Sequence, residues 1–298
     1  MVAERICLAA PAKINLYLKI TGQRTDGYHE LNTLMQKLAL FDELEVEPTA
    51  EPGIFLTCPN ADLAVDKNNI VYRAVRLFLD RTGRSGQGIK IVLTKKIPIA
   101  AGLGGGSSDA AATLLGLDRL LAAECTREEL AAMGLMLGAD VPFFIYDMAA
   151  AWATGIGEKL AAAVPLAGYR VLLVNPGLSV STKWAYETFA LTSGQNIFNL
   201  SSSQKEYGEI DQGAAFCKRP FQPEELVNDL ETITADKFSV IGEIKQQLLT
   251  AGAAGAMMSG SGPTVFGLFA ADAHRQAEHC CNEFKNKYDK VYLVDPLA

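Results

Sequence analysis

The sequence predicts an α+β protein of two domains, and three observations lead to this fold class. The chain has 298 residues, more than the commonest single-domain size, so we expect two domains or one large one. Strand-like and helix-like hydrophobic patterns alternate, but without the regular strand–helix–strand order of a doubly wound sheet. A glycine turn at residues 155–158 precedes an alanine-rich stretch and a new strand pattern. We therefore expect an N-terminal domain over residues 1–160 and a C-terminal domain over residues 161–298.

The expected N-terminal domain opens with a strand over residues 5–20. Apolar residues occupy the even positions from 14 to 20, and lysine, asparagine and tyrosine occupy the odd positions from 13 to 19, which is the period of a strand. Apolar spacings of three and four residues predict helices further along the chain. In chain order we expect a turn at 21–27, an apolar stretch at 31–40, a strand at 43–47, a helix at 69–79, a strand at 89–93, and helices at about 108–123 and 127–137.

The expected C-terminal domain begins with a strand over residues 169–174. Residues 193–222 are polar and contain glycine and a run of three serines, which predicts a surface insertion. Beyond it the pattern predicts helices over 224–230 and 240–249, and then a glycine turn between two strand-like runs within residues 256–266.

Composition narrows the class of protein. The net charge of −7 argues against a nucleic-acid partner, which a basic face would favour. The six cysteines show no Cys-x-x-Cys spacing, which is typical of reduced thiols, and the five-residue spacing of His274 and His279 disfavours a structural zinc. Pro11 interrupts the apolar N-terminal run and Lys13 ends it, and we find neither a signal peptide nor a membrane span. We therefore expect a cytoplasmic protein.

The stretch from Pro98 to Ser108 carries the strongest functional signal. Four glycines stand just before two serines and a helical pattern, so backbone N–H groups and the positive end of a helix dipole would surround the loop. Such a loop binds anions, above all phosphate. The loop lacks the lysine of a Walker loop and the third glycine of a dinucleotide fingerprint, so it matches neither motif. A glycine cluster before a helix could also be only a tight connection between two elements. The candidate ATP-binding residues are Lys96, Pro98, Ile99, Ala100, Ala101, Gly102, Leu103, Gly104, Gly105, Gly106, Ser107 and Ser108.

The glycine loop resembles the nucleotide-binding motif of the GHMP kinases, the family of galactokinase, homoserine kinase and mevalonate kinase. Pro-Ala-Lys-Ile-Asn-Leu at 11–16 and Ser-Gly-Ser-Gly at 259–262 resemble two further motifs of this family, in the expected order. The resemblance implies a two-domain GHMP-kinase-like fold with the active site in the interdomain cleft. It implies ATP as co-substrate, Mg²⁺ on the phosphates, and a small-molecule acceptor. We expect a monomer or homodimer, with no nucleic acid and no membrane as partner.

Lys13 and Asp140 are the candidate catalytic residues. From the pattern alone, Lys13 could be a solvated strand lysine, or an ammonium that stabilises charge on the transferred phosphoryl group. Asp140 stands in an apolar stretch, where a buried carboxylate needs a cationic partner or has a raised pKa, but it could also be a turn aspartate before a proline. The resemblance implies that Asp140 is the general base, and that Lys13 assists and keeps it ionised.

A second group of residues points to the acceptor. Tyr28 and His29 follow Asp-Gly in a turn, and a tyrosine beside a histidine can stack on a base and hydrogen-bond its edge. The resemblance, closest to those GHMP kinases whose acceptor is a cytidine diphosphate derivative of methylerythritol, implies that Tyr28, His29 and Tyr186 contact the cytidine. It places Asn15 and Thr182 in the same substrate site, although Tyr186 could equally be a core aromatic. This subfamily acts in the non-mevalonate synthesis of isoprenoid precursors.

Several interpretations remain open at this point. Residues 259–262 could offer N–H groups to a phosphate, or could only support the first glycine loop. Asn228-Asp-Leu-Glu matches a further sequence motif of the family, but its role does not follow from the sequence. The Asp109 carboxylate would repel a nearby phosphate, so we expect it to point away from the nucleotide. The alternative functions are a GHMP kinase acting on homoserine or mevalonate, and a non-catalytic nucleotide- or RNA-binding module. Competition by cytidine nucleotides would separate the kinases.

Overall fold

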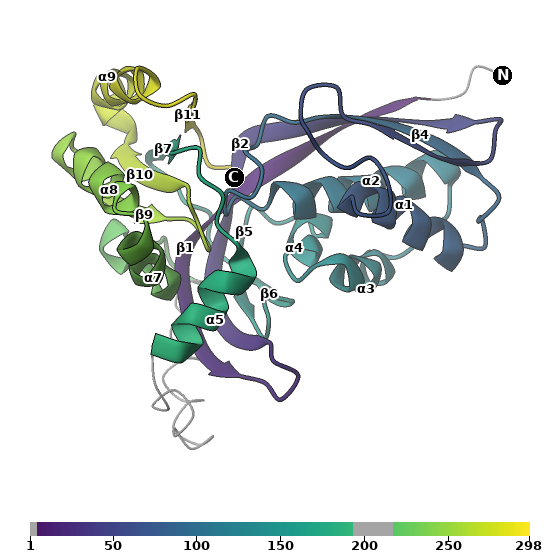
Figure 1. The fold of residues 1–298 in the computed structure, drawn as a ribbon, viewed down its shortest axis with the longest axis horizontal. Coiled ribbons are helices and arrows are strands. Elements are labelled where there is room, and N and C mark those ends of the chain that lie inside the picture. The colour runs from purple at the N-terminus through teal and green to yellow at the C-terminus, as the bar shows by residue number, and fades with distance from the viewer. Residues whose placement is uncertain (1–4, 193–216) are drawn as a thin grey trace. The chain divides into compact units, whose positions relative to one another are not determined.

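A computed structural model describes residues 5–192 and 217–298, and the chain forms two compact units (Figure 1). Unit 1 comprises residues 1–12, 40–99 and 104–148, and unit 2 comprises 13–39, 100–103 and 149–298. The long strands β1 (Ile6–Gln23) and β2 (His29–Thr49) contribute residues to both units. The units therefore interleave in sequence, and the division at residue 160 stays a prediction.

Unit 1 combines strands and helices, as its hydrophobic patterns predict. The second half of β2 pairs antiparallel with β4, which pairs parallel with β3 on its other side. Helices α1 and α2 contact one another, α3 and α4 pack together, and aromatic side chains such as Phe78 and Phe143 are fully buried. The elements are β3 (Gly53–Thr57), α1 (Ile70–Arg81), β4 (Gly88–Thr94), α2 (Gly105–Leu121), α3 (Arg127–Leu137) and α4 (Val141–Ile145).

Local signals explain where these helices begin. The Asn69 side chain accepts the N–H of Val71 at 2.8 Å and caps α1, whose buried residues recur at helical spacing. Thr126 and Glu129 form a capping box at the start of α3. Helix α2 begins at Gly105, three residues before its predicted start, because Gly104 adopts a left-handed conformation and serves as its N-cap residue.

Unit 2 contains a four-stranded antiparallel sheet of order β11-β7-β10-β9. Helix α8 packs on β9 and β10, and α9 packs on β7 and β11. Elsewhere in the unit β5 pairs with β2 and β6, and the short β8 pairs with β1. The elements are β5 (Ala150–Thr154), β6 (Lys159–Ala162), β7 (Tyr169–Asn175), α5 (Thr182–Thr192), η2 (Pro223–Glu225), β8 (Val227–Asn228), α7 (Asp229–Lys237), α8 (Val240–Thr250), β9 (Gly255–Met258), β10 (Val265–Ala270), η3 (Ala271–Ala273), α9 (His274–Lys285) and β11 (Lys290–Val294).

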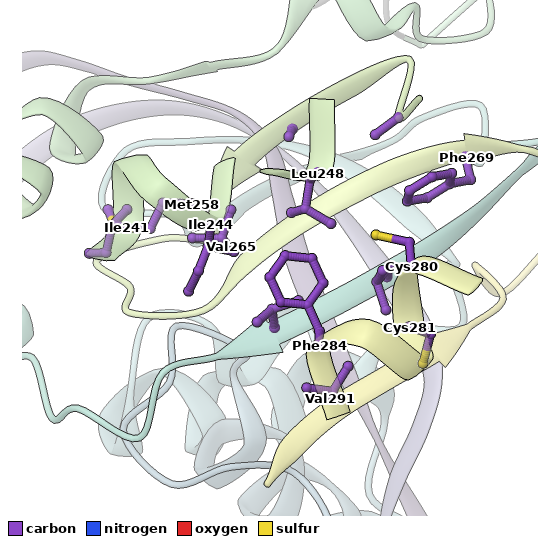
Figure 2. Close-up of a cluster of buried hydrophobic side chains, with 14 of the residues drawn as sticks. Ile241, Ile244, Leu248, Met258, Val265, Phe269, Cys280, Cys281, Phe284 and Val291 are labelled. Atoms are coloured by element: carbon purple, nitrogen blue, oxygen red, sulfur yellow. The ribbon is translucent and has the colours of Figure 1, made fainter. Parts of the chain in front are cut away.

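Figure 2 shows the hydrophobic core of unit 2, where side chains of α8, α9 and the sheet meet. Leu248 of α8, Val265 of β10 and Phe284 of α9 are among its buried members. Cys280 and Cys281 also belong to this buried cluster, and all six cysteines of the chain are unpaired. Burial raises the pKa of the Cys280 thiol to about 11, so it packs as a small apolar group.

Three predicted elements differ from the structure. The stretches 31–40 and 43–47 belong to the one continuous strand β2. The helix predicted over 224–230 is wrong, because a 3₁₀ turn and β8 occupy most of it, and α7 starts where Asn228 caps the N–H of Leu230 at 3.0 Å. Of the predicted insertion at 193–222, residues 193–216 lie outside the described residues. Within the described ranges no helix is long and apolar enough to cross a bilayer.

Candidate active site

Lys13 lies on β1 and is buried, with 4% of the residue exposed. Its Nζ donates a hydrogen bond to Asn15 Oδ1 at 2.6 Å, and Asn15 Nδ2 donates to Thr33 Oγ1 at 2.8 Å. The Thr33 hydroxyl donates in turn to the carbonyl of Tyr17 at 2.7 Å. The interpretation of Lys13 as a solvated strand lysine is therefore wrong, because both faces of β1 are covered here. A buried polar chain instead fixes the position of its ammonium group.

The first part of the glycine loop, residues 100–103, is fixed within unit 2. The Lys13 N–H donates to the Leu103 carbonyl at 2.9 Å, and Ser259 Oγ donates to the Gly102 carbonyl at 2.9 Å. Gly102 has φ +75°, and a Cβ there would lie 2.1 Å from the Ser259 carbonyl oxygen. Only glycine fits at this close approach.

The turn at residues 259–262 therefore supports the glycine loop, which is one of the two interpretations left open by the sequence. Asn228 Nδ2 donates to the carbonyls of Met258 and Gly260, each at 2.8 Å. Glu231 Oε2 accepts the N–H of Met258 at 2.7 Å. Asn228 and Glu231 thus fix the turn at 259–262, and Ser259 of this turn binds the Gly102 carbonyl. Sequence reasoning found their motif but missed their role, since their partners lie about 30 residues away and in a different element.

The second part of the loop, residues 104–108, belongs to unit 1 and opens α2. The first N–H groups of a helix have no intrahelical partner, so they and the positive end of the dipole are available to an anion. Ser108 Oγ is buried and makes no hydrogen bond among the described residues. Lys96, another predicted ATP ligand, is half exposed and pairs with Glu43 Oε1 at 2.5 Å.

Asp140 stands in unit 1 at the N-cap position of α4, and the residue is only partly buried. The assignment of Asp140 as the general base therefore stays a prediction. Its side chain makes no capping hydrogen bond with the helix. Lys13 belongs to unit 2, so the pairing of Lys13 with Asp140 stays a prediction.

In unit 2 the structure brings two of the predicted base-binding residues together. The rings of His29 and Tyr186 stack, with centroids 5.2 Å apart and planes inclined by 27°. His29 Nε2 is buried and makes no hydrogen bond among the described residues, and burial lowers the pKa of this imidazole. Tyr28 is 60% exposed in the adjoining turn. Thr182, at the start of α5, shares a hydrogen bond of 2.9 Å with the Ser261 hydroxyl.

Comparison with known proteins identifies the family of the chain. Residues 69–148 match the family model of the GHMP kinases N terminal domain, and residues 218–289 match that of the GHMP kinases C terminal. A protein of Syntrophotalea carbinolica named 4-diphosphocytidyl-2-C-methyl-D-erythritol kinase is 47% identical over 97% of this chain and 98% of its own length. A protein of Desulfotalea psychrophila with the same name is 43% identical over 99% of this chain and 97% of its own length.

Solved structures support the same assignment. A crystal structure of 4-(cytidine 5'-diphospho)-2C-methyl-D-erythritol kinase is 33% identical, with a TM-score of 0.76 over 98% of this chain and 100% of that one. A mevalonate kinase from L. major has a TM-score of 0.74 over 100% of this chain and 98% of that one, but at 18% identity it shows the fold alone. The chain belongs to the GHMP kinase family and, within it, to the 4-diphosphocytidyl-2-C-methyl-D-erythritol kinases.

Proposed function

We propose that this chain transfers the γ-phosphoryl group of ATP to the 2-hydroxyl of 4-diphosphocytidyl-2-C-methyl-D-erythritol, giving the 2-phosphate and ADP. The reaction belongs to the non-mevalonate synthesis of isoprenoid precursors. The names of the full-length relatives support the substrate. The single structural observation that carries it is the stack of His29 on Tyr186, in which the buried His29 Nε2 has no hydrogen-bond partner among the described residues.

The chemistry of the stack suits a cytosine ring. A buried polar atom without a partner is costly, so a nitrogen such as His29 Nε2 favours a ligand that can pair with it. The lowered pKa keeps this imidazole neutral at physiological pH, and a neutral imidazole has one donor and one acceptor nitrogen. Cytosine presents an amino donor beside acceptor atoms and a flat face for Tyr186. We therefore assign His29, Tyr186 and the exposed Tyr28 to the cytidine, and Asn15 and Thr182 to the rest of the acceptor.

The glycine loop, residues 98–108, is assigned to the phosphates of ATP. Its backbone N–H groups at the start of α2 and the Ser108 hydroxyl supply donors. Among the residues that the structure describes, no group of three or more His, Cys, Asp and Glu side chains could hold a metal ion. Mg²⁺ bound together with ATP would neutralise charge on the phosphate oxygens beside this loop.

Asp140 and Lys13 are assigned to the transfer step. The Asp140 carboxylate, not engaged in capping α4, accepts the proton of the 2-hydroxyl as the oxygen attacks the γ-phosphorus in line. The Lys13 ammonium, held by Asn15, stabilises the negative charge that develops during the transfer. Rate enhancement arises from orientation and electrostatics, with no covalent enzyme intermediate. We further propose that the enzyme acts in the cytoplasm as a monomer or homodimer, without a nucleic-acid partner.

Cytidine recognition gives the first prediction. His29→Ala should raise the KM for the acceptor by about 10-fold or more, because a site that pairs with a polar base loses that pairing, while the KM for ATP stays near the wild-type value. Tyr186→Ala should have a similar effect, and Tyr186→Phe, which keeps the stacked ring, should have a smaller one. Steady-state kinetics with each substrate varied in turn measures these changes.

Competition supplies the control for this prediction. CDP should inhibit the wild-type enzyme competitively against the acceptor, and UDP should do so less well. Equal inhibition by both nucleotides would refute base recognition by His29. Phosphorylation of homoserine or mevalonate, with no inhibition by CDP, would establish the alternative kinase function.

A further inference from the structure

Unit 1 contains a buried charged cluster that the proposed mechanism does not use. Lys95 follows β4, and its Nζ donates to Asp109 Oδ2 of α2 at 2.7 Å and to Asp42 Oδ2 of β2. The three side chains are 6%, 3% and 0% exposed, respectively. We call these three residues the Lys95 cluster. It joins three elements that are separate in sequence, at the place where the chain enters the glycine loop.

The cluster also holds the backbone that leads into the loop. The second oxygen of Asp42, Oδ1, accepts the N–H of Lys96 at 2.5 Å and the N–H of Ile97 at 2.8 Å. One carboxylate therefore binds both the ammonium and two consecutive backbone donors. Charge-assisted hydrogen bonds of this kind are short and directional, so the loop entry has little freedom relative to β2.

The first residue of α2 packs directly on the cluster. A Cβ at Gly105 would lie 3.0 Å from Ile97 Cγ2, 3.2 Å from Lys95 Nζ and 3.3 Å from Asp42 Oδ2. No side chain fits at this position without a shift of the cluster or of the helix. Gly106 differs, because it is exposed and the nearest atom to a Cβ there would be Ile70 Cγ2, at 3.7 Å.

We propose that the Lys95 cluster is a positioning device for ATP: it sets the start of α2 so that the N–H groups of the loop face the phosphates. The inference deepens the proposed function, since it depends on the loop as the phosphate site. None of the three residues need touch the nucleotide. They act through the backbone of residues 96–97 and through Gly105.

The net charge of the Lys95 cluster should affect the binding of anionic ATP, which a purely structural role of the cluster would not predict. With all three groups ionised, two carboxylates and one ammonium carry a net charge of −1 close to the proposed anion site. Asp109 Oδ1 is buried with no hydrogen-bond partner among the described residues. Burial raises the pKa of Asp109 to about 7, although the ammonium of Lys95 opposes the rise. Burial tends to lower the pKa of Lys95, but Asp109 and Asp42 together raise it, so Lys95 stays charged.

The sign of the pH effect follows from these groups. Besides Lys95 and Asp42, Cys58, which follows β3, interacts electrostatically with Asp109, and burial raises the pKa of this thiol further above neutrality. Asp109 is therefore the group in the cluster that changes charge near pH 7. A protonated Asp109 removes the excess negative charge, so ATP affinity should be higher at pH 6 than at pH 8.

The experiment compares the dissociation constant for MgATP at pH 6 and pH 8, by calorimetry, in the wild type and Asp109→Asn. Asparagine keeps an oxygen for Lys95 but cannot ionise. From pH 6 to pH 8 the MgATP affinity of the wild type should fall by about 3- to 10-fold more than that of Asp109→Asn, because only the wild type gains a negative charge at residue 109. Titration of ATP itself is common to both proteins and cancels in the comparison. Equal pH dependence of the two proteins would overturn the role of Asp109 charge.

Two further variants test the positioning itself. Lys95→Met should raise the KM for ATP by about 10-fold or more, with a smaller change in kcat and in the KM of the acceptor, and Lys95→Arg should recover part of the loss. If Lys95→Met does not fold, Gly105→Ala replaces it, with the same expectation. ATP constants within two-fold of wild type in a folded Lys95→Met or Gly105→Ala protein would refute the inference.

Gly106→Ala separates this inference from the proposed function. Its methyl group would project from the loop and away from the cluster, so it should weaken ATP binding only if the loop is the phosphate site. Normal ATP binding in Gly106→Ala would contradict the assignment of the loop. Weak ATP binding in Gly106→Ala, with normal binding in the cluster variants, would contradict the positioning role alone.

Discussion

Asp140→Asn should lower kcat by about 100-fold or more, because asparagine keeps the shape of the side chain but cannot accept the proton of the acceptor hydroxyl. The dissociation constant for MgATP should stay within about two-fold of wild type, since the group acts only in the transfer step. Thermal stability should also change little, because asparagine has nearly the same size and shape as aspartate and Asp140 is only partly buried. Steady-state kinetics, calorimetry and a melting curve on the same preparation give the three quantities.

Asp147→Asn is the matched control for this variant. Asp147 is an exposed aspartate in the same unit, seven residues along the chain, and its amide variant should retain wild-type kcat. A loss of ATP affinity in Asp140→Asn as large as the loss of kcat would refute the general-base assignment. So would a kcat within about five-fold of wild type.

Gly102→Ala should both destabilise the protein and weaken ATP binding. The left-handed backbone at φ +75° costs an alanine about 1–3 kcal/mol. The added Cβ would also lie 2.1 Å from the Ser259 carbonyl oxygen, so the loop must move away from its support. We expect the KM for ATP to rise on the order of 10-fold or more, since small displacements of positioning groups have large effects.

Gly168→Ala separates the two causes. Gly168 also lies in unit 2 and has φ +79°, but nothing lies within 4 Å of its Cβ position. It should show the cost of the backbone conformation without the change in ATP binding. A similar loss of ATP affinity in both variants would mean that general destabilisation, and not the contact between Gly102 and Ser259, causes the effect.

Sequence reasoning succeeded where the signal was local. The α+β class, helix α1 and the glycine turn between β9 and β10 all follow from residues that are neighbours in the chain. Each of these features depends on periodicity or a compact sequence pattern.

The features that sequence reasoning missed depend on contacts between distant residues. Asn228 caps α7, which is a local signal, but its bonds to Met258 and Gly260 cannot be derived from spacing. Lys13 looked like a member of a polar strand face, yet neighbouring strands and loops cover that face. The Lys95 cluster pairs residues 53 and 14 positions apart. Periodicity carries no information on such pairs.

The most direct test of the proposed function is to follow the transfer of the phosphoryl group by phosphorus NMR. The purified protein would be mixed with ATP, Mg²⁺ and 4-diphosphocytidyl-2-C-methyl-D-erythritol, and the phosphorus NMR spectrum recorded over time, with Asp140→Asn as the parallel sample. We expect a new phosphomonoester resonance on the 2-position of the methylerythritol, with ADP formed in equal amount, and almost no reaction in the variant. ADP formation without that resonance, or an unchanged spectrum for the wild-type protein, would contradict the proposed function.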